Sequence, residues 1–193
     1  MSYCTVDDVK TYLGISETDD DVLLALCIER AQAAIDAYTS RTFEATADAT
    51  KKLDAIADVD GRTLYVRAAG DLCAIKSVTN GDGSVLASTD YVTQPRSYTP
   101  YYAIRLLASS GHTWTYVTDS ENAITIAGRW AYRISAPADI EQACMRLAVV
   151  YYRQKDTTAE IDRPLLAGDG TVVMPQTTPS DVRALLKPYR RML

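Results

Sequence analysis

The sequence predicts an α+β protein in which helices at the two ends of the chain flank a β-rich middle. Apolar residues recur at helical spacing in the first 40 residues and again after residue 137, whereas short β-favouring runs separated by turn residues fill the middle. The chain of 193 residues, 47% of them hydrophobic, is long enough to bury a core without a disulfide or a metal ion. We therefore expect a helical core at residues 1–44 and 135–155, a β-rich insertion at 45–134, and a mobile C-terminal arm at 156–193.

The N-terminal region predicts two helices. Thr5 and Asp8 have the spacing of a capping box, and Gly14 follows where a short helix over residues 5–14 would end. The acidic run that follows favours the N-terminal cap and dipole of a longer helix over residues 20–40, rather than a cation site. The inward stripe of that helix is Leu24, Cys27, Ile28, Ala31, Ile35 and Tyr38.

The middle of the chain predicts a compact antiparallel sheet or a small barrel. Gly, Pro and Asn residues separate its apolar runs, and Asn80-Gly81 between two such runs predicts a hairpin. The β-favouring runs are Thr63–Val66, Ala74–Thr79, Tyr91–Thr93, Tyr102–Leu107, Trp114–Val117 and Ala123–Ala127.

Helical spacing returns at Pro137, a residue that suits the first turn of a helix. The apolar stripe beginning at Ile140 predicts that this helix pairs with the helix of residues 20–40 as an antiparallel hairpin or bundle. Residues 156–178 lack periodicity, and a last helix begins near Pro179 and is stopped or kinked by Pro188. Its inner residues are Val182, Leu185, Leu186 and Tyr189, and its outer residues are Arg183, Lys187 and Arg190.

Charge is unevenly distributed along the chain. The net charge is −5, but residues 1–60 have 13 acids and 5 bases, whereas residues 61–193 have 12 acids and 15 bases. The last twelve residues contain four bases and no acid. The net acidity argues against a protein that coats nucleic acid. The asymmetry favours head-to-tail or partner contacts, although a solvated basic terminus is an alternative.

The cysteine pattern and the N-terminus indicate a protein made in a reducing cytoplasm. Cys4, Cys27, Cys73 and Cys144 are widely spaced without a CxxC pair, which is typical of buried thiols. The first ten residues lack the features of a signal peptide, and no apolar stretch is long enough to span a bilayer. We expect no membrane association.

No catalytic, cofactor or metal motif is evident. His112 stands beside Ser109 and Ser110, but without a GxSxG elbow the segment is typical of a turn. Neither zinc-ligand nor calcium-loop spacing is present. We therefore expect no enzyme activity and no cofactor. A cluster of bases and aromatics resembles an oligonucleotide surface but favours a protein interface in an acidic chain: Arg96, Tyr98, Tyr101, Tyr102 and Arg105.

The two helical ends contain several motifs in a defined order. The N-terminal motifs are Thr5–Lys10 followed by Tyr12-Leu13-Gly14, then Asp20-Asp21-x-Leu23-Leu24, and Ala31-x-x-Ala34-Ile35-x-x-Tyr38-x-x-Arg41-x-Phe43. The C-terminal motifs are Gly128-Arg129-Trp130-Ala131, Pro137-Ala138-Asp139-Ile140, and Ala143 with Tyr151-Tyr152. Their order and spacing resemble those of the head–tail connector (adaptor) proteins of tailed bacteriophages.

This resemblance implies a structural virion protein without catalytic residues, made in the host bacterial cytoplasm and located in the head–tail neck. Members of that family assemble as a dodecameric ring under the portal, extend the channel through which double-stranded DNA passes, and form the platform for a stopper or tail-completion protein. We expect a portal or partner surface at Arg183, Leu185, Leu186, Lys187, Tyr189, Arg190 and Arg191. Candidate subunit contacts are Asp20, Asp21, Glu29, Arg146 and Arg153.

Two alternatives remain from the sequence. One is another neck or tail ring protein, such as a head-closure or tail-terminator protein, although the helices at both ends argue against a β-dominated fold. The other is a small binding module or enzyme whose site has no recognised motif.

Overall fold

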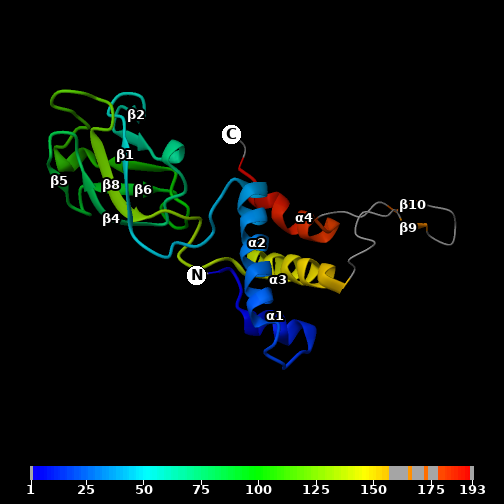
Figure 1. Cartoon of the computed structure of the whole chain (residues 1–193). Coiled ribbons are helices and arrows are strands. Elements are labelled where there is room, and N and C mark those ends of the chain that lie inside the picture. Colours follow the sequence, from blue (N-terminus) through cyan, green and yellow to red (C-terminus); the bar gives the residue numbers. More distant parts are fainter. Residues whose placement is uncertain (1, 157–164, 167–171, 174–177, 192–193) are drawn as a thin grey trace. The chain divides into compact units, whose positions relative to one another are not determined.

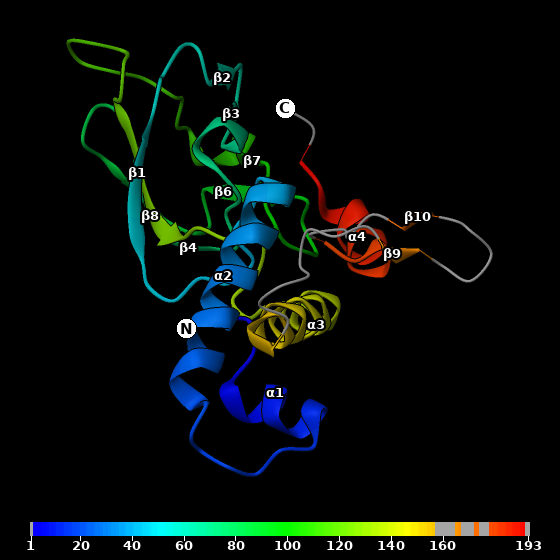
Figure 2. The same cartoon turned by 45° about the vertical axis from the view of Figure 1, so that its right-hand side comes forward.

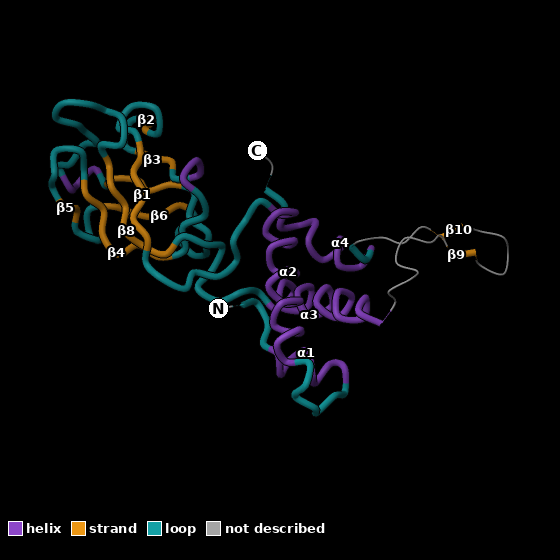
Figure 3. Tube along the Cα trace, viewed as in Figure 1, coloured by secondary structure: helices purple, strands orange, loops and turns teal. Residues whose placement is uncertain are grey.

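The structure is a computed structural model that describes residues 2–156, 165–166, 172–173 and 178–191. The chain forms two compact units, one made of Met1–Ser40 with Pro137–Leu193 and the other of Arg41–Ala136. Figures 1 and 3 show helices in the first unit and the larger sheets in the second. Most of the expected arm, at residues 157–164, 167–171 and 174–177, lies outside the described residues.

The helical unit begins with α1 (Val6–Leu13), which is closed at both ends by local interactions. The Thr5 side chain accepts a hydrogen bond from the Asp8 N–H, and the Asp8 carboxylate accepts one from the Thr5 N–H. Gly14 ends the helix with φ of 71°, in the left-handed region that glycine adopts without a steric cost. The predicted capping box and the predicted helix end are both confirmed.

Helices α2 (Asp21–Thr39) and α3 (Ala138–Arg153) pack on each other. Their contacts run in opposite chain order, because Cys144 Sγ lies 4.0 Å from the Ile28 carbonyl oxygen and the Tyr152 hydroxyl donates to Asp20 at the start of α2. The helix axes are inclined to each other in both views (Figures 1 and 2). The buried side chains between them include most of the apolar stripes that the sequence shows.

Helix α4 (Ser180–Leu186) packs on α3 and touches α2. Val182 and Leu186 are buried, and the α-helix ends at Leu186 before a 3-10 turn at Lys187–Tyr189 that contains Pro188. The stop predicted from Pro188 is therefore confirmed. A short strand pair, β9 (Leu165–Leu166) with β10 (Val172–Val173), precedes α4 in the chain.

The second unit is built from two four-stranded antiparallel sheets. One has the order β1 (Ala49–Leu53), β8 (Ile124–Arg129), β4 (Ala74–Thr79) and β5 (Val85–Leu86). The other has the order β2 (Val59–Asp60), β3 (Thr63–Tyr65), β7 (Ala103–Leu106) and β6 (Tyr91–Gln94). Their inner residues share one hydrophobic core that includes Leu64, Val78, Ile104 and Ile126. Within the described residues these strands form two open sheets and not a closed barrel.

The hairpin expected at Asn80-Gly81 is present between β4 and β5. The Asn80 side chain is buried at its base, donating to the Thr113 carbonyl (2.9 Å) and accepting from the N–H groups of Gly81 and Thr115 (3.0 and 3.2 Å). A Cβ at Gly81 would lie 2.2 Å from the Thr115 carbonyl oxygen, so the turn requires glycine at this position.

The prediction of a strand at Trp114–Val117 was wrong. Trp114 is buried instead, and its indole N–H donates to the Arg62 carbonyl at 3.0 Å, so tertiary packing determines the local conformation. Strands β1, β2 and β5 were not predicted. β1 contains two lysines and only one buried residue, Leu53, so its sequence lacks a clear apolar alternation.

Candidate functional site

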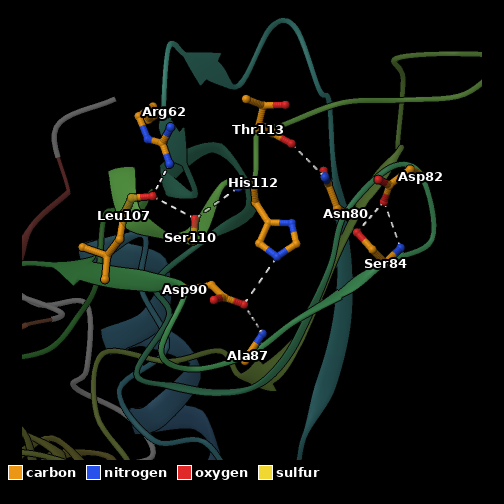
Figure 4. A network of polar contacts seen from close by, with 10 residues as sticks. All are labelled: Arg62, Asn80, Asp82, Ser84, Ala87, Asp90, Leu107, Ser110, His112 and Thr113. Carbon is orange, nitrogen blue, oxygen red and sulfur yellow. Dashed lines mark hydrogen bonds and ion pairs between the residues drawn. The ribbon is translucent and has the colours of Figure 1, made fainter.

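The polar network around His112 is the first place to look for chemistry (Figure 4). His112 Nε2 lies 3.7 Å from Asp90 Oδ2, while the Ser110 hydroxyl donates to the Leu107 carbonyl at 2.8 Å and accepts from the His112 backbone N–H at 3.3 Å. The serine proton therefore points to a carbonyl and not to the imidazole ring. A serine nucleophile needs a base that takes its proton, so this arrangement is a turn and not a catalytic dyad.

The neighbouring residues of the network also stabilise turns. Asp82 accepts hydrogen bonds from the hydroxyl and the N–H of Ser84, and these bonds hold the pKa of the Asp82 carboxyl below its usual value. Asp90 Oδ2 accepts from the Ala87 N–H at 2.9 Å. Each carboxylate therefore satisfies backbone donors beside it in the sequence, which is the common role of aspartate in turns.

The described part of the chain contains no cluster of side chains suited to bind a metal ion. Among these residues, no group of three or more His, Cys, Asp or Glu side chains could hold a metal ion. In the acidic turn at residues 54–60, Asp54 accepts from the N–H groups of Ile56 and Ala57, and Asp58 accepts from the Asp54 N–H. All four cysteines are buried free thiols. None of the described helices is both long and apolar enough to cross a membrane.

Two motif segments that are far apart in the sequence lie side by side at one end of the β unit. The Tyr132 N–H donates to the Thr42 carbonyl (2.8 Å) and the Arg133 N–H to the Phe43 carbonyl (3.2 Å). Phe43 is fully buried with its ring 5.6 Å from that of Tyr132, and Arg41 pairs with Asp71 at 2.6 Å. The Arg-x-Phe motif and the segment after Gly-Arg-Trp-Ala therefore close this unit where the chain enters and leaves it.

The predicted partner residues of the C-terminal helix divide into a buried and an exposed group. Leu186 is only 1% exposed, and Leu185 and Tyr189 are half-buried, the Tyr189 hydroxyl donating to Asp139 at 3.0 Å. The Arg191 N–H donates to the Thr39 carbonyl at 2.9 Å. The exposed group is Arg183, Lys187 and Arg190, and Arg190 lies 5.9 Å above the Tyr38 ring.

The first turn of α4 contains an acidic residue, Asp181, directly before the basic last twelve residues. Asp181 forms an ion pair with Arg146 on α3. This helix is thus joined to the helical unit by an apolar seam, an ion pair and a tyrosine hydrogen bond, and its described residues belong to that unit.

The five candidate subunit-contact residues also divide. Asp21 pairs with Lys10 at 2.9 Å, and Arg146 pairs with Asp181. Asp20 accepts from Lys155 and Tyr152, and the hydrogen bond from Lys155 is the largest cause that holds its pKa below the usual value. Asp20 occupies the N-cap position of α2 at the end of the acidic run, although its side chain makes no capping hydrogen bond. The remaining two, Glu29 and Arg153, are exposed.

Glu29 borders a surface hollow that the sequence does not indicate. The hollow, of about 560 Å³, lies along α2 and beside the N-terminal segment, and both of its carboxylates come from α2. Asp36 accepts a hydrogen bond from the Tyr3 hydroxyl at 2.5 Å, and partial burial raises the pKa of its carboxyl. The lining residues are Ser2, Val6, Ala25, Ile28, Glu29, Gln32, Ala33 and Asp36.

The expected cluster of bases and tyrosines is only partly at the surface. Tyr101 packs against the core of the β unit, and Tyr102 is half-buried with the Arg67 guanidinium 4.9 Å above its ring. Tyr98, Arg96 and Arg105 are exposed.

The described residues form an α+β fold in which the charged side chains named above contact turns, form ion pairs or lie exposed. The model of the head completion protein family matches residues 2–192, and the chain belongs to this family. This confirms the resemblance to phage head–tail connector proteins at the level of a structural head-completion protein. No curated protein matches the sequence.

Two solved structures contain chains of similar fold. One is the neck of an empty GTA particle computed with C6 symmetry, with 19% identity, a TM-score of 0.58, and coverage of 97% of this chain and 90% of that chain. The other is the virion of a native gene transfer agent (GTA) particle, with 20% identity, a TM-score of 0.55, and the same coverage of both chains.

Proposed function

We propose that this protein is a subunit of the head–tail neck of a phage-like particle, where it forms a ring with other copies of itself and joins the filled head to tail components. The observation that carries this proposal is the family match over residues 2–192. It is supported by the similarity to a chain of a particle neck that was computed with C6 symmetry. The virion neck is the corresponding location.

The expected partners are those of the connector family. The portal lies on the head side, a stopper or tail-completion protein on the tail side, and double-stranded DNA passes through the ring. A net charge of −5 suits such a channel, since a wall that bound phosphate tightly would retard the DNA. A dodecamer is the expected state in the virion. The helical hairpin or bundle would form the body of the ring.

We restrict the proposed partner surface of the C-terminal helix to its exposed cations. Because Val182 and Leu186 are buried in the helical unit, the contact is made by the outward cations Arg183, Lys187 and Arg190. The portal is the partner that the family resemblance suggests for this surface.

A complementation assay tests the proposed function. Particles assembled without this protein should accumulate as DNA-filled heads separate from tails, and the purified protein should restore joined, infective or transfer-competent particles. Electron microscopy would locate a tagged chain at the vertex between head and tail. Normal joining in the absence of the protein would refute the neck role.

The absence of catalysis remains a prediction. A fluorophosphonate probe that labels activated serines should leave Ser110 unmodified, because its hydroxyl is bonded to the Leu107 carbonyl. Labelling that the Ser110→Ala variant abolishes would reopen the enzyme hypothesis.

A further inference from the structure

The acidic hollow on α2 has the chemistry of a receptor for cationic side chains. Glu29 and Asp36 lie seven residues apart, hence on the same side of the helix and about 10 Å apart along its axis. The apolar residues Val6, Ala25 and Ala33 line the same hollow. Long basic side chains place their aliphatic stems on such apolar surface while their charged heads meet carboxylates.

Glu29 has no partner of opposite charge among the described residues. Among the described residues its carboxylate forms no hydrogen bond or ion pair, and the residue is exposed. The Asp36 carboxylate has the Tyr3 hydroxyl as its one hydrogen-bond donor among the described residues, and partial burial raises the pKa of this carboxyl. A cation entering the hollow would therefore gain two carboxylates that the chain itself leaves without a counter-ion.

The complementary surface is the outer face of α4 and the turn that follows it. Arg183 and Lys187 are four residues apart and both exposed, and within the described residues neither side chain has a hydrogen-bond or ion-pair partner. They project from a helix that Val182 and Leu186 hold in place, so this cationic face is rigidly presented.

Among the described residues, no hydrogen bond or ion pair joins the two surfaces within one chain. In Figure 1 the labelled N-terminus and α4 lie on opposite sides of α2. Because both surfaces belong to the helical unit, every copy presents one receptor and one cationic face. A contact between two different faces of identical chains is heterologous, and repeating it generates a ring when the rotation closes.

We propose that the hollow of one copy receives Arg183 and Lys187 of a second copy, with Glu29 and Asp36 as their counter-charges. This inference rests on the proposed function, since it assigns the contact that would propagate the ring. It also assigns the outer face of α4 to the neighbouring subunit in place of the portal.

Charge reversal with complementation tests the contact directly. Glu29→Arg alone and the double variant Arg183→Glu/Lys187→Glu alone each place like charges opposite each other, so each should weaken self-association at least about tenfold in sedimentation velocity. In an equimolar mixture, every contact can pair opposite charges if the two variants alternate, and self-association should return. Lys52→Glu, which reverses an exposed cation on strand β1 and lies in neither proposed surface, is the matched control and should associate like the wild type.

Zero-length carbodiimide coupling provides a second measurement, because it joins carboxylates to lysine amines. A mixture of ¹⁴N- and ¹⁵N-labelled wild-type chains should yield mixed-isotope peptides that link Glu29 or Asp36 to Lys187. Failure of the mixture to restore association would overturn the proposal, as would a wild-type chain that stays monomeric and gives no such peptides.

The experiment also separates this inference from the neck function. If the α4 double variant self-associates normally but no longer joins portal-bearing heads, α4 binds the portal and the inference is wrong. If the wild-type protein fails to join heads to tails in the complementation assay, the proposed neck function itself is wrong.

Discussion

The guanidinium of Arg146 on α3 pairs with the carboxylate of Asp181 in the first turn of α4. In the 3-10 turn that follows α4, the Tyr189 hydroxyl donates to Asp139 at the start of α3. These two contacts hold both ends of the C-terminal helix on α3, with Val182 and Leu186 buried between them. The basic C-terminal segment therefore presents its cations from a fixed helix.

The ion pair should contribute modestly to stability because both side chains are more than one-third exposed. In a double-mutant cycle with Arg146→Ala and Asp181→Ala, we expect a coupling energy of about 0.2–1 kcal/mol that decreases at high salt. Hydrogen exchange of the α4 amides is the suitable readout. A salt-independent coupling would contradict an ionic origin.

The Leu186 side chain should matter far more than its charged neighbours. We expect Leu186→Ala to destabilise the helical unit by about 2–4 kcal/mol, since it removes a side chain that is 1% exposed and leaves a cavity. Lys187→Ala, which changes the next residue on the exposed side, should alter the free energy of unfolding by less than about 0.5 kcal/mol. Urea unfolding followed by helical circular dichroism measures both. Equal, small effects would show that α4 is not docked in solution.

The contact of Asp20 with Lys155 and Tyr152 should produce an acid-dependent loss of stability. These hydrogen bonds lower the pKa of Asp20 from about 3.8, so the folded state is favoured above that pH and the gain is lost as pH falls through the lowered pKa. We expect Asp20→Asn to be less stable than wild type at pH 7, with a difference that shrinks below about pH 4. Asp19→Asn, at the exposed preceding residue, is the control for thermal unfolding between pH 2 and 7. A constant difference over this range would contradict the linkage.

Gly128, which lies in strand β8 and begins the Gly-Arg-Trp-Ala motif, should be intolerant of any side chain. A Cβ there would lie 2.2 Å from the Ala74 carbonyl oxygen, where β4 and β8 pair beside an irregularity in register. We expect Gly128→Ala to destabilise the β unit by about 1–3 kcal/mol. Thr50→Ala, on the exposed side of the edge strand β1, should cost less than about 0.5 kcal/mol. Comparable unfolding midpoints for the two variants would show that β4 and β8 can move apart at Gly128 without a loss of stability.

Local interactions explain why parts of this fold could be predicted. The capping box of Thr5 and Asp8, the left-handed Gly14 and the stop before Pro188 each depend on residues within a few positions of one another. The Asn80-Gly81 turn was also predictable from its residue types, although the structure requires glycine there because of the distant Thr115 carbonyl.

Long-range pairing explains where prediction failed. β1 is a strand because it pairs with β8, more than 70 residues later, and Lys51 packs over the Trp130 ring at 4.6 Å. Trp114 has a strand-favouring sequence around it, but its indole N–H donates to the carbonyl of Arg62, in the turn between β2 and β3. Such interactions override local propensity and cannot be read from short windows of sequence.

The sequence by itself determined the α+β class, the positions of the main helices, the charge asymmetry and the resemblance to head–tail connectors, because periodicity, capping and motif order are properties of the chain. Only the tertiary structure decided which charged residues remain free for partners. Asp20, Asp21 and Arg146 are engaged by side chains 11 to 135 residues away, whereas Glu29, Arg183 and Lys187 remain exposed. The physical reason is that the partner of a charged side chain depends on which distant residues folding brings within contact distance, and local sequence patterns do not contain this information.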